Sequence, residues 1–244
     1  MPSIWNKLIG LSKRTIWQIY APIYDSILIL EPYTRYLKEC ATLLDLQPNQ
    51  ILLDVGCGTG NFLIPITTGQ VYAVDYSPNM LSLAKLKIYF LKMFRNPDQE
   101  IYFIRLDANE KLPIANEVFD CVVSLSSIHS FTNPKISVSE MLRVLRPGGR
   151  ILLTVPLPVS TVSIIKEHLS RASFPRLLAS IIMAPVFIGV LAVNLLQERW
   201  GREGEFKFLT TDQVLNITFD LPLEIIQIKK CFSKTYTLLL ARKL

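Results

Sequence analysis

Three aspartates in this chain of 244 residues stand at the ends of runs of β-forming residues, where acidic side chains can hold a cationic or hydroxyl-bearing ligand. Asp54 lies near the end of ILLDV, Asp75 ends VYAVD, and Asp107 follows IYFIRL. Open α/β sheets bind their ligands at the carboxyl ends of parallel strands, because these ends meet at one edge of the sheet. The sequence therefore predicts a ligand site at this edge, within reach of the three carboxylates.

A glycine-rich turn directly follows Asp54. Gly56, Gly58 and Gly60 form the pattern GxGxG, and glycines in such a turn permit positive φ angles and a close approach of the backbone to a ligand. A dinucleotide-binding loop would have GxGxxG, but residue 61 is Asn. Asp54 would also repel a pyrophosphate, whereas it suits S-adenosylmethionine, which carries an ammonium and a sulfonium and has no phosphate.

Asp75 lies 19 residues beyond Gly56, at the end of the next predicted strand. An acidic side chain at this place can accept hydrogen bonds from both hydroxyls of a ribose. NAD would use the same residue, so Asp75 indicates a ribose and leaves the rest of the ligand open.

The chain alternates β-type and helical segments, which is typical of a mainly parallel sheet with crossover helices. Strands are predicted at 51–55, 71–75, 101–106, 119–125 and 150–155, and helices at 61–67, 78–94 and 134–145. Residues 223–232 and 235–244 are separated by only two residues, which predicts an antiparallel hairpin. We therefore expect an α/β protein with a Rossmann-like, doubly wound, mainly parallel sheet of seven strands that ends in this hairpin.

The length of the chain fits one catalytic domain with an insertion better than two domains. We expect four regions. Residues 1–46 would form an N-terminal helical lid, 47–156 the cofactor-binding core, 157–209 an apolar helical insertion, and 210–244 a helix and hairpin that complete the sheet.

Four segments together resemble the ordered motifs of class I S-adenosylmethionine-dependent methyltransferases. They are LLDVGCGTGNF (52–62), VYAVDYSPNML (71–81), DANEKLPIANEVFDCVVS (107–124) and MLRVLRPGGRILLTVP (141–156). Their spacing and the LRPGG segment most resemble the branch that contains the ubiquinone and menaquinone biosynthesis methyltransferases. The resemblance implies an enzyme with S-adenosylmethionine as its cofactor.

The resemblance also implies which residues bind the methionine part of that cofactor. Asp54 and the backbone of Gly56, Cys57 and Gly58 would face it, and Gly60 would complete the glycine loop. Asp54 alone has a second interpretation, as a helix cap at the end of a strand.

The ribose and adenine contacts would come from the two following loops. Asp75 would bind the ribose, Tyr76 and Met80 would contact the adenine ring, Asp107 would accept from the adenine amino group, and the Ala108 amide would lie at the ring edge. Each residue alone also has a structural interpretation, because tyrosine and methionine are ordinary core residues and aspartate favours turns. The ordered succession of all of them favours the cofactor site.

Methyl transfer is an in-line displacement at a carbon that a sulfonium already activates, so the protein must mainly align the acceptor and exclude water. A base would help only if the acceptor were a phenol, a hydroquinone or an acidic carbon. His129, which follows the fourth strand, is the candidate base, although a histidine there could equally bind a loop or line the pocket. The resemblance places the Ser124 carbonyl near the cofactor ammonium.

The segment YAPIYDSI (20–27) resembles an aromatic segment that precedes the core in the quinone-type branch and closes over the cofactor. Tyr20 and Tyr24 are therefore candidate lid residues. The alternative is an amphipathic helix that packs its tyrosines against the sheet.

Residues 177–197 form a run of 21 uncharged residues between Arg176 and Glu198. Its length permits a transmembrane helix, but a single span would separate the hairpin from the sheet that it must join. Pro185 and Gly189 divide the run into two short pieces, so we expect a membrane-dipping or pocket-capping insertion. The alternatives are an ordinary core and a dimer interface.

An apolar cover over the pocket would favour a lipophilic acceptor, such as a prenylated quinone precursor or another lipid-like molecule. Peripheral membrane contact is expected through 1–30 and 174–198, because tryptophans and basic residues of the N-terminal segment would lie beside the insertion. We therefore expect a cytoplasmic protein, or one that is peripheral on the inner face of the membrane.

The composition argues against several other partners. The net charge is +6 without an arginine-rich tract, so no nucleic acid is expected. The four cysteines are far apart and form no CxxC pair, so neither a disulfide framework nor a metal site is expected. The N-terminal segment has no continuous apolar run of the kind found in secretion signals.

Three other functions compete with an S-adenosylmethionine-dependent methyltransferase that acts on a small molecule. They are an NAD-dependent oxidoreductase, a methyltransferase acting on nucleic acid, and a non-enzymatic, membrane-associated binding module with the same fold. Asn61 and Asp54 argue against the first, and the intact glycine loop argues against the last. The acceptor atom and the oligomeric state stay open.

Overall fold

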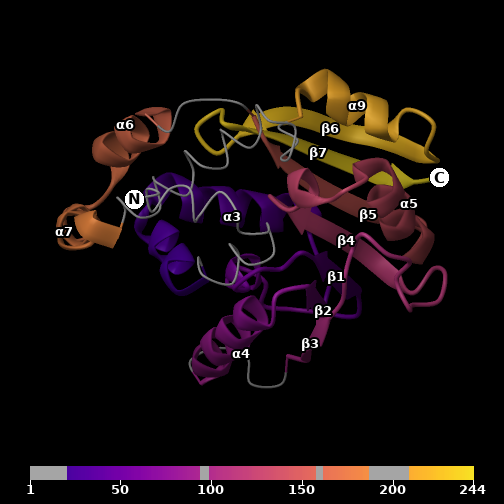
Figure 1. The fold of residues 1–244 in the computed structure, drawn as a ribbon, viewed down its shortest axis with the longest axis horizontal. Helices are drawn as coiled ribbons and strands as arrows, with labels where there is room; N and C mark the ends of the chain where they lie inside the picture. The colour runs from indigo at the N-terminus through magenta and orange to yellow at the C-terminus, as the bar shows by residue number, and fades with distance from the viewer. Residues whose placement is uncertain (1–20, 94–98, 158–161, 187–208) are drawn as a thin grey trace, which may run out of the picture.

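The strands form where the sequence has short runs of buried, β-branched and aliphatic residues. In the computed structural model, which describes residues 21–93, 99–157, 162–186 and 209–244, they build one sheet (Figure 1). Its strands are β1 Ile51–Val55, β2 Gln70–Asp75, β3 Ile101–Arg105, β4 Phe119–Leu125, β5 Leu145–Pro156, β6 Leu223–Cys231 and β7 Tyr236–Lys243. This confirms the predicted seven-stranded α/β fold with its C-terminal hairpin.

The strand order is β3-β2-β1-β4-β5-β7-β6. The pairs from β3 to β5 are parallel, and β7 is antiparallel to both β5 and β6. The chain runs outward from β1 in one direction through β2 and β3, and in the other direction from β4. The neighbouring carboxyl ends of β1 and β4 are therefore a topological switch point, where open α/β sheets leave a crevice for a ligand.

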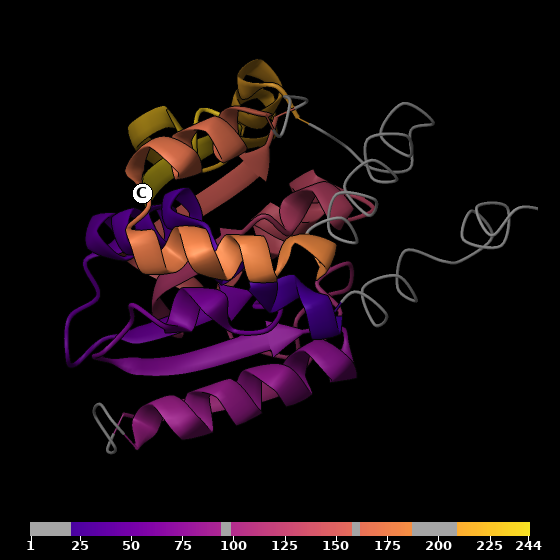
Figure 2. The same ribbon diagram turned by 90° about the vertical axis from the view of Figure 1, so that its left-hand side faces the viewer.

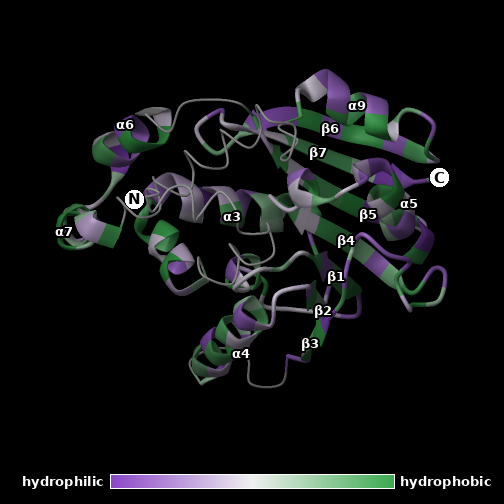
Figure 3. Cartoon of the chain, in the orientation of Figure 1, coloured by the Kyte–Doolittle hydropathy of each residue, from purple (hydrophilic) through white to green (hydrophobic). Residues whose placement is uncertain are grey.

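Helices cover both faces of the sheet and divide the core into two apolar clusters. The helices are η1 Asp25–Ile29, α3 Glu31–Leu44, η2 Asn61–Leu63, α4 Pro78–Lys92, η3 Ile128–Ser130, α5 Pro134–Val144, α6 Val162–Arg171, α7 Phe174–Ile182 and α9 Thr211–Thr218. Buried residues of α3 and α4 belong to one cluster, and those of α5 and α9 to the other. Figure 3 shows hydrophobic residues along the strands that lie between these layers.

Local sequence signals fix where the helices begin. Ser77 caps α4, because its side chain accepts a hydrogen bond from the Met80 amide, and Pro78 occupies the first turn. Asn133 caps α5 in the same way. Thr210 and Gln213 form a reciprocal capping box at α9.

Two predicted boundaries are wrong. Residues 61–67 form only the short η2, because Pro65 has no amide hydrogen to continue a helix. Strand β5 begins at Leu145 rather than at residue 150, because Leu145 already pairs with Phe119 before the irregularity in the β4–β5 register.

The insertion contributes α6 and α7, which lie at the edge of the molecule and come before α9 and the hairpin (Figures 1 and 2). Within the described ranges, no helix is both long and apolar enough to span a bilayer. The predicted segments 1–20 and 187–198, including Tyr20, lie outside the described residues.

Candidate active site

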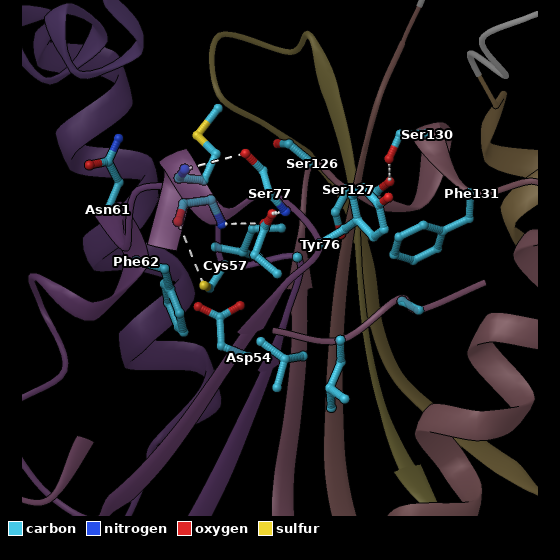
Figure 4. Close-up of a pocket in the computed structure, with 18 of the residues that line it drawn as sticks. Asp54, Cys57, Asn61, Phe62, Tyr76, Ser77, Ser126, Ser127, Ser130 and Phe131 are labelled. Atoms are coloured by element: carbon cyan, nitrogen blue, oxygen red, sulfur yellow. Dashed lines mark hydrogen bonds between the residues drawn. The ribbon is translucent and has the colours of Figure 1, made fainter. Parts of the chain in front are cut away.

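A pocket of about 240 Å³ opens at the carboxyl ends of the parallel strands. Figure 4 shows side chains of the loops after β1, β2 and β4 around it. Its lining comes from Tyr24, which precedes η1, from α3, and from these loops together with the one after β3. The lining residues are Tyr24, Tyr33, Tyr36, Leu37, Asp54, Gly56, Cys57, Gly58, Asn61, Phe62, Val74, Asp75, Tyr76, Ser77, Met80, Leu106, Asp107, Ala108, Asn109, Leu125, Ser126, Ser127, Ser130, Phe131 and Thr132.

The glycine loop after β1 forms the floor of this pocket. The amides of Gly56 and Cys57 both donate to the Val74 carbonyl, at 2.8 and 3.0 Å. Gly56 has a φ of +74°, and a Cβ there would lie 2.5 Å from the Ser127 Cβ, so no larger residue fits. Gly58, with a φ of +55°, faces open space instead, which leaves its backbone accessible to a ligand in the pocket.

Asp54 is a buried acid without a counter-charge. Its side chain is 1% exposed, and its Oδ2 has no hydrogen-bond partner among the described residues. Burial, with a further contribution from the negative charge of Asp75, raises the pKa of Asp54 to about 8. A buried carboxylate in this state gains most from a cationic ligand group, because the cation replaces the lost hydration.

Asp75 holds two loops together and still faces the pocket. Its Oδ2 accepts from the Gly58 amide and its Oδ1 from the Ser77 amide, both at 2.8 Å. Burial raises the pKa of Asp75, and the backbone hydrogen bonds partly oppose this effect. Each carboxylate oxygen has more than one lone pair, so both can still accept from ligand hydroxyls.

The loops after β2 and β3 supply the next part of the wall. The Arg105 guanidinium lies over the Tyr76 ring, with its Cζ 5.2 Å from the ring centroid. Met80 is buried beside the pocket. Asp107 Oδ1 accepts from the amide and the side chain of Asn109, at 3.0 and 2.8 Å. Ala108 lines the pocket next to them.

Three residues predicted from the sequence lie outside the pocket lining. Gly60 precedes η2 and packs near Ala84. Ser124 is fully buried, and its hydroxyl donates to the Val55 carbonyl at 3.0 Å. His129, in η3, is 4% exposed and does not line the pocket. Their roles toward the cofactor or the acceptor stay predictions.

Apart from Tyr24, the aromatic wall of the pocket was not predicted from the sequence. Tyr33 and Tyr36 of α3 line the pocket together with Tyr24. The Tyr36 ring stacks on Phe232 at 5.4 Å, and its hydroxyl lies 2.6 Å from the Thr154 hydroxyl. Burial raises the pKa of all three tyrosines, so their hydroxyls are neutral. The spacing of three between Tyr33 and Tyr36 could have indicated this wall, because it places both on one helix face.

The loop after β4 was also missed as pocket lining. Ser126, Ser127, Ser130 and Phe131 reach the pocket, and Figure 4 shows them opposite the glycine loop. Ser126 has a φ of +55°, and its amide donates to the Thr154 carbonyl at 3.1 Å. No sequence signal indicates a left-handed serine, because this conformation depends on the contact with β5.

A charged cluster ties η1 to the glycine loop. The Lys87 ammonium lies 2.7 Å from the Asp25 carboxylate and 3.2 Å from the Thr59 hydroxyl, and it also contacts the Asn61 side chain. Thr59 donates to Asp25 at 2.5 Å. These contacts hold the segment that carries Tyr24 over the cofactor end of the pocket.

Comparison with known proteins identifies a methyltransferase domain. Residues 53–153 match the family model described as a methyltransferase domain. The chain carries a class I methyltransferase domain. Its relatives include the demethylmenaquinone methyltransferase of Bacillus cereus (strain AH187), which is 24% identical over 212 residues that cover 85% of this chain and 84% of that protein.

Solved structures share the fold of this methyltransferase. The cyclase SpnF superposes with a TM-score of 0.66 at 16% identity and covers 94% of both chains. The magnesium protoporphyrin IX methyltransferase of Synechocystis PCC 6803, with bound S-adenosylhomocysteine, has a TM-score of 0.55 at 14% identity and covers 98% of this chain and 93% of that one. At such identities the likeness concerns the fold alone.

S-adenosylmethionine is the cofactor of this methyltransferase, and the pocket fits it on physical grounds. The unpartnered Asp54 oxygen suits an ammonium, and Asp75 can accept from ribose hydroxyls. The described residues contain no group of His, Cys, Asp and Glu side chains that could hold a metal ion.

Proposed function

We propose that this methyltransferase transfers the methyl group of S-adenosylmethionine to a lipophilic, ring-containing small molecule. The observation that carries the proposal is the contrast between the two ends of one pocket. The buried Asp54 and the half-buried Asp75 lie at the end formed by β1 and β2, whereas Tyr36 of α3, whose hydroxyl contacts Thr154 of β5, and Phe131 of the loop after β4 lie toward β5. The acidic end suits the cationic cofactor, and the aromatic end suits an apolar acceptor.

A quinone-like ring is the acceptor class that we favour. The aromatic wall offers ring faces for stacking on a planar acceptor, and the tyrosine hydroxyls beside these faces are neutral. A relative that is 24% identical is named for demethylmenaquinone, which agrees with this class.

The chain's own contribution to the reaction is alignment and exclusion of water. The bound cofactor supplies a methyl group on a sulfonium, which needs only an in-line nucleophile. Among the described residues that line the pocket, the ionisable side chains are aspartates, tyrosines and Cys57, and none is a histidine or lysine. A hydroquinone acceptor would therefore pass its proton to one of these aspartates, to water, or to a group outside the lining such as His129.

We also propose His129 as a base and Ser124 as a carbonyl contact, although both are buried and neither is among the residues that line the pocket. The division into lid, core, insertion and C-terminal region is likewise part of the proposal. We also propose peripheral contact with the inner face of the membrane, supported by the exposed apolar residues of α7.

The test is methyl transfer from S-adenosylmethionine with a labelled methyl group to a panel of hydroquinones with and without prenyl tails. Small polar phenols and amines serve as controls. The proposal predicts label in the organic extract with the apolar hydroquinones and little with the polar compounds. Transfer to polar acceptors alone would contradict the acceptor class and leave the cofactor assignment intact.

A further inference from the structure

Helices α6 and α7 direct their polar side chains toward the rest of the protein. His168 is buried between them, where its Nδ1 accepts from the Glu31 amide at 3.1 Å and its Nε2 lies 2.8 Å from the Ser180 hydroxyl. Since Nδ1 accepts and the Ser180 hydroxyl already donates to the Arg176 carbonyl, this histidine is neutral with its proton on Nε2. It joins α6, α7 and the start of α3.

Two further polar links attach the pair of helices to their surroundings. Arg176 of α7 donates to the Thr34 hydroxyl of α3 at 2.9 Å. Glu167 of α6 is paired with Arg35 of α3, and it accepts from Ser233 in the hairpin turn at 2.5 Å. Hydrogen bonds and ion pairs therefore form a large part of the contacts that attach α6 and α7 to the protein. A surface helix is usually attached through an apolar face instead.

The apolar side chains of the same helices point away from the protein. Phe174 is 77%, Ile181 72% and Ile182 68% exposed, and Leu169 and Ile165 of α6 are exposed as well. In Figure 2, α7 lies across the front of the molecule with the sheet behind it. An amphipathic helix normally buries such residues, so their exposure on two neighbouring helices indicates an apolar partner.

The charges on this surface indicate what kind of partner it is. Lys166 and Arg171 of α6 are both exposed, and both line the groove between α6, α3 and the hairpin turn. Glu167 is the one acidic residue between 162 and 186, and it is already paired with Arg35 and Arg171. The surface is thus apolar and basic without a free acid, which is the combination that binds the headgroups and outer acyl chains of anionic lipids.

We propose that α6 and α7 form a docking surface for a bilayer that contains anionic phospholipid. The basic side chains would contact lipid phosphates while Phe174, Ile181 and Ile182 insert below them. Because α6 and α7 are attached to α3, and α3 carries Tyr33 and Tyr36 of the pocket, docking would place the aromatic end of the site beside the membrane. The inference rests on the peripheral membrane contact proposed above and deepens it by naming the surface and the lipid, and bilayer binding itself requires neither cofactor nor acceptor.

The experiment is flotation of the full chain with vesicles of phosphatidylcholine and phosphatidylglycerol in equal parts, compared with phosphatidylcholine alone. The test variant is Phe174→Ser/Ile181→Ser/Ile182→Ser, and the matched control is Phe219→Ser, which changes an 84% exposed residue that follows α9. We expect stronger binding to the anionic vesicles, weakened by salt. The test variant should lose about tenfold or more in affinity, and the control should bind as the unchanged chain does.

Equal vesicle binding by the test variant, or no binding by the unchanged chain, would overturn the proposal. A change of oligomeric state in the test variant without a change in vesicle binding would also overturn it, and would assign the surface to a second copy of the chain. S-adenosylmethionine affinity, measured on the same samples, should be unchanged in both variants. Vesicle binding without any cofactor binding would leave this inference standing and contradict the proposed function alone.

Discussion

At the scale of single residues, the site depends on carboxylates that the fold buries before any ligand binds. The position of Asp54 beside the glycine loop could be predicted from the sequence, because the order of strand, acid and glycines is local. The unpartnered Oδ2 of Asp54 and the raised pKa of this carboxyl could not be predicted from the sequence, because both depend on the packing of β1 between β2 and β4. The same is true of Ser126, whose left-handed backbone is held by Thr154 of β5.

Asp54 makes the stability of the ligand-free protein depend on pH. Its pKa is about 8 in the folded protein, against an ordinary value of 3.8, so between these limits the folded state binds more protons than the unfolded chain. The free energy of unfolding should therefore fall as the pH rises through this range, by up to several kcal/mol in order of magnitude.

Thermal unfolding of the ligand-free protein at a series of pH values checks this expectation. Asp54→Asn should flatten the dependence and raise the melting temperature at alkaline pH, while it weakens S-adenosylmethionine binding. Asp212→Asn, a change in the first turn of α9 far from the pocket, is the control. An unchanged pH profile in Asp54→Asn would show that the carboxyl is not held in an unfavourable ionised state.

At the scale of elements, the sequence predicted the strands well, because each contains a short run rich in β-branched, aliphatic or aromatic residues. The helix predicted at 61–67 failed at Pro65, and the early start of β5 was missed because its pairing with Phe119 is a long-range contact. The aromatic wall from α3 was missed because its residues come together with Phe232 only in the folded chain.

Lys87 of α4 links η1 to the glycine loop. These two elements must stay together for the pocket to be covered. Lys87→Met should release the segment that carries Tyr24 and reduce the affinity for S-adenosylmethionine by about fivefold, equivalent to ~1 kcal/mol. Lys85→Met, an exposed position on the same helix, should have no effect. Isothermal titration of both variants measures the difference, and equal affinities would show that the cluster does not support the cofactor end.

At the scale of the whole molecule, the fold by itself does not determine the reaction. The cyclase SpnF has the same architecture as this chain, and so does a porphyrin methyltransferase. What narrows the function is the combination of a methyltransferase family match with one pocket that is acidic at one end and aromatic at the other. The fold class could be predicted from the sequence, whereas the two-ended character of the pocket required the structure.

The central claim is that the acidic end of this pocket binds S-adenosylmethionine through Asp75 and its neighbours. Calorimetric titration of S-adenosylmethionine tests it most directly, with NADH as the competing ligand, Asp75→Ala as the site variant and Asp220→Ala, an exposed carboxylate, as the control. The account predicts saturable binding that Asp75→Ala weakens by about a hundredfold or more while Asp220→Ala does not change it. Binding of NADH alone, or equal S-adenosylmethionine affinity in a folded Asp75→Ala variant, would contradict it.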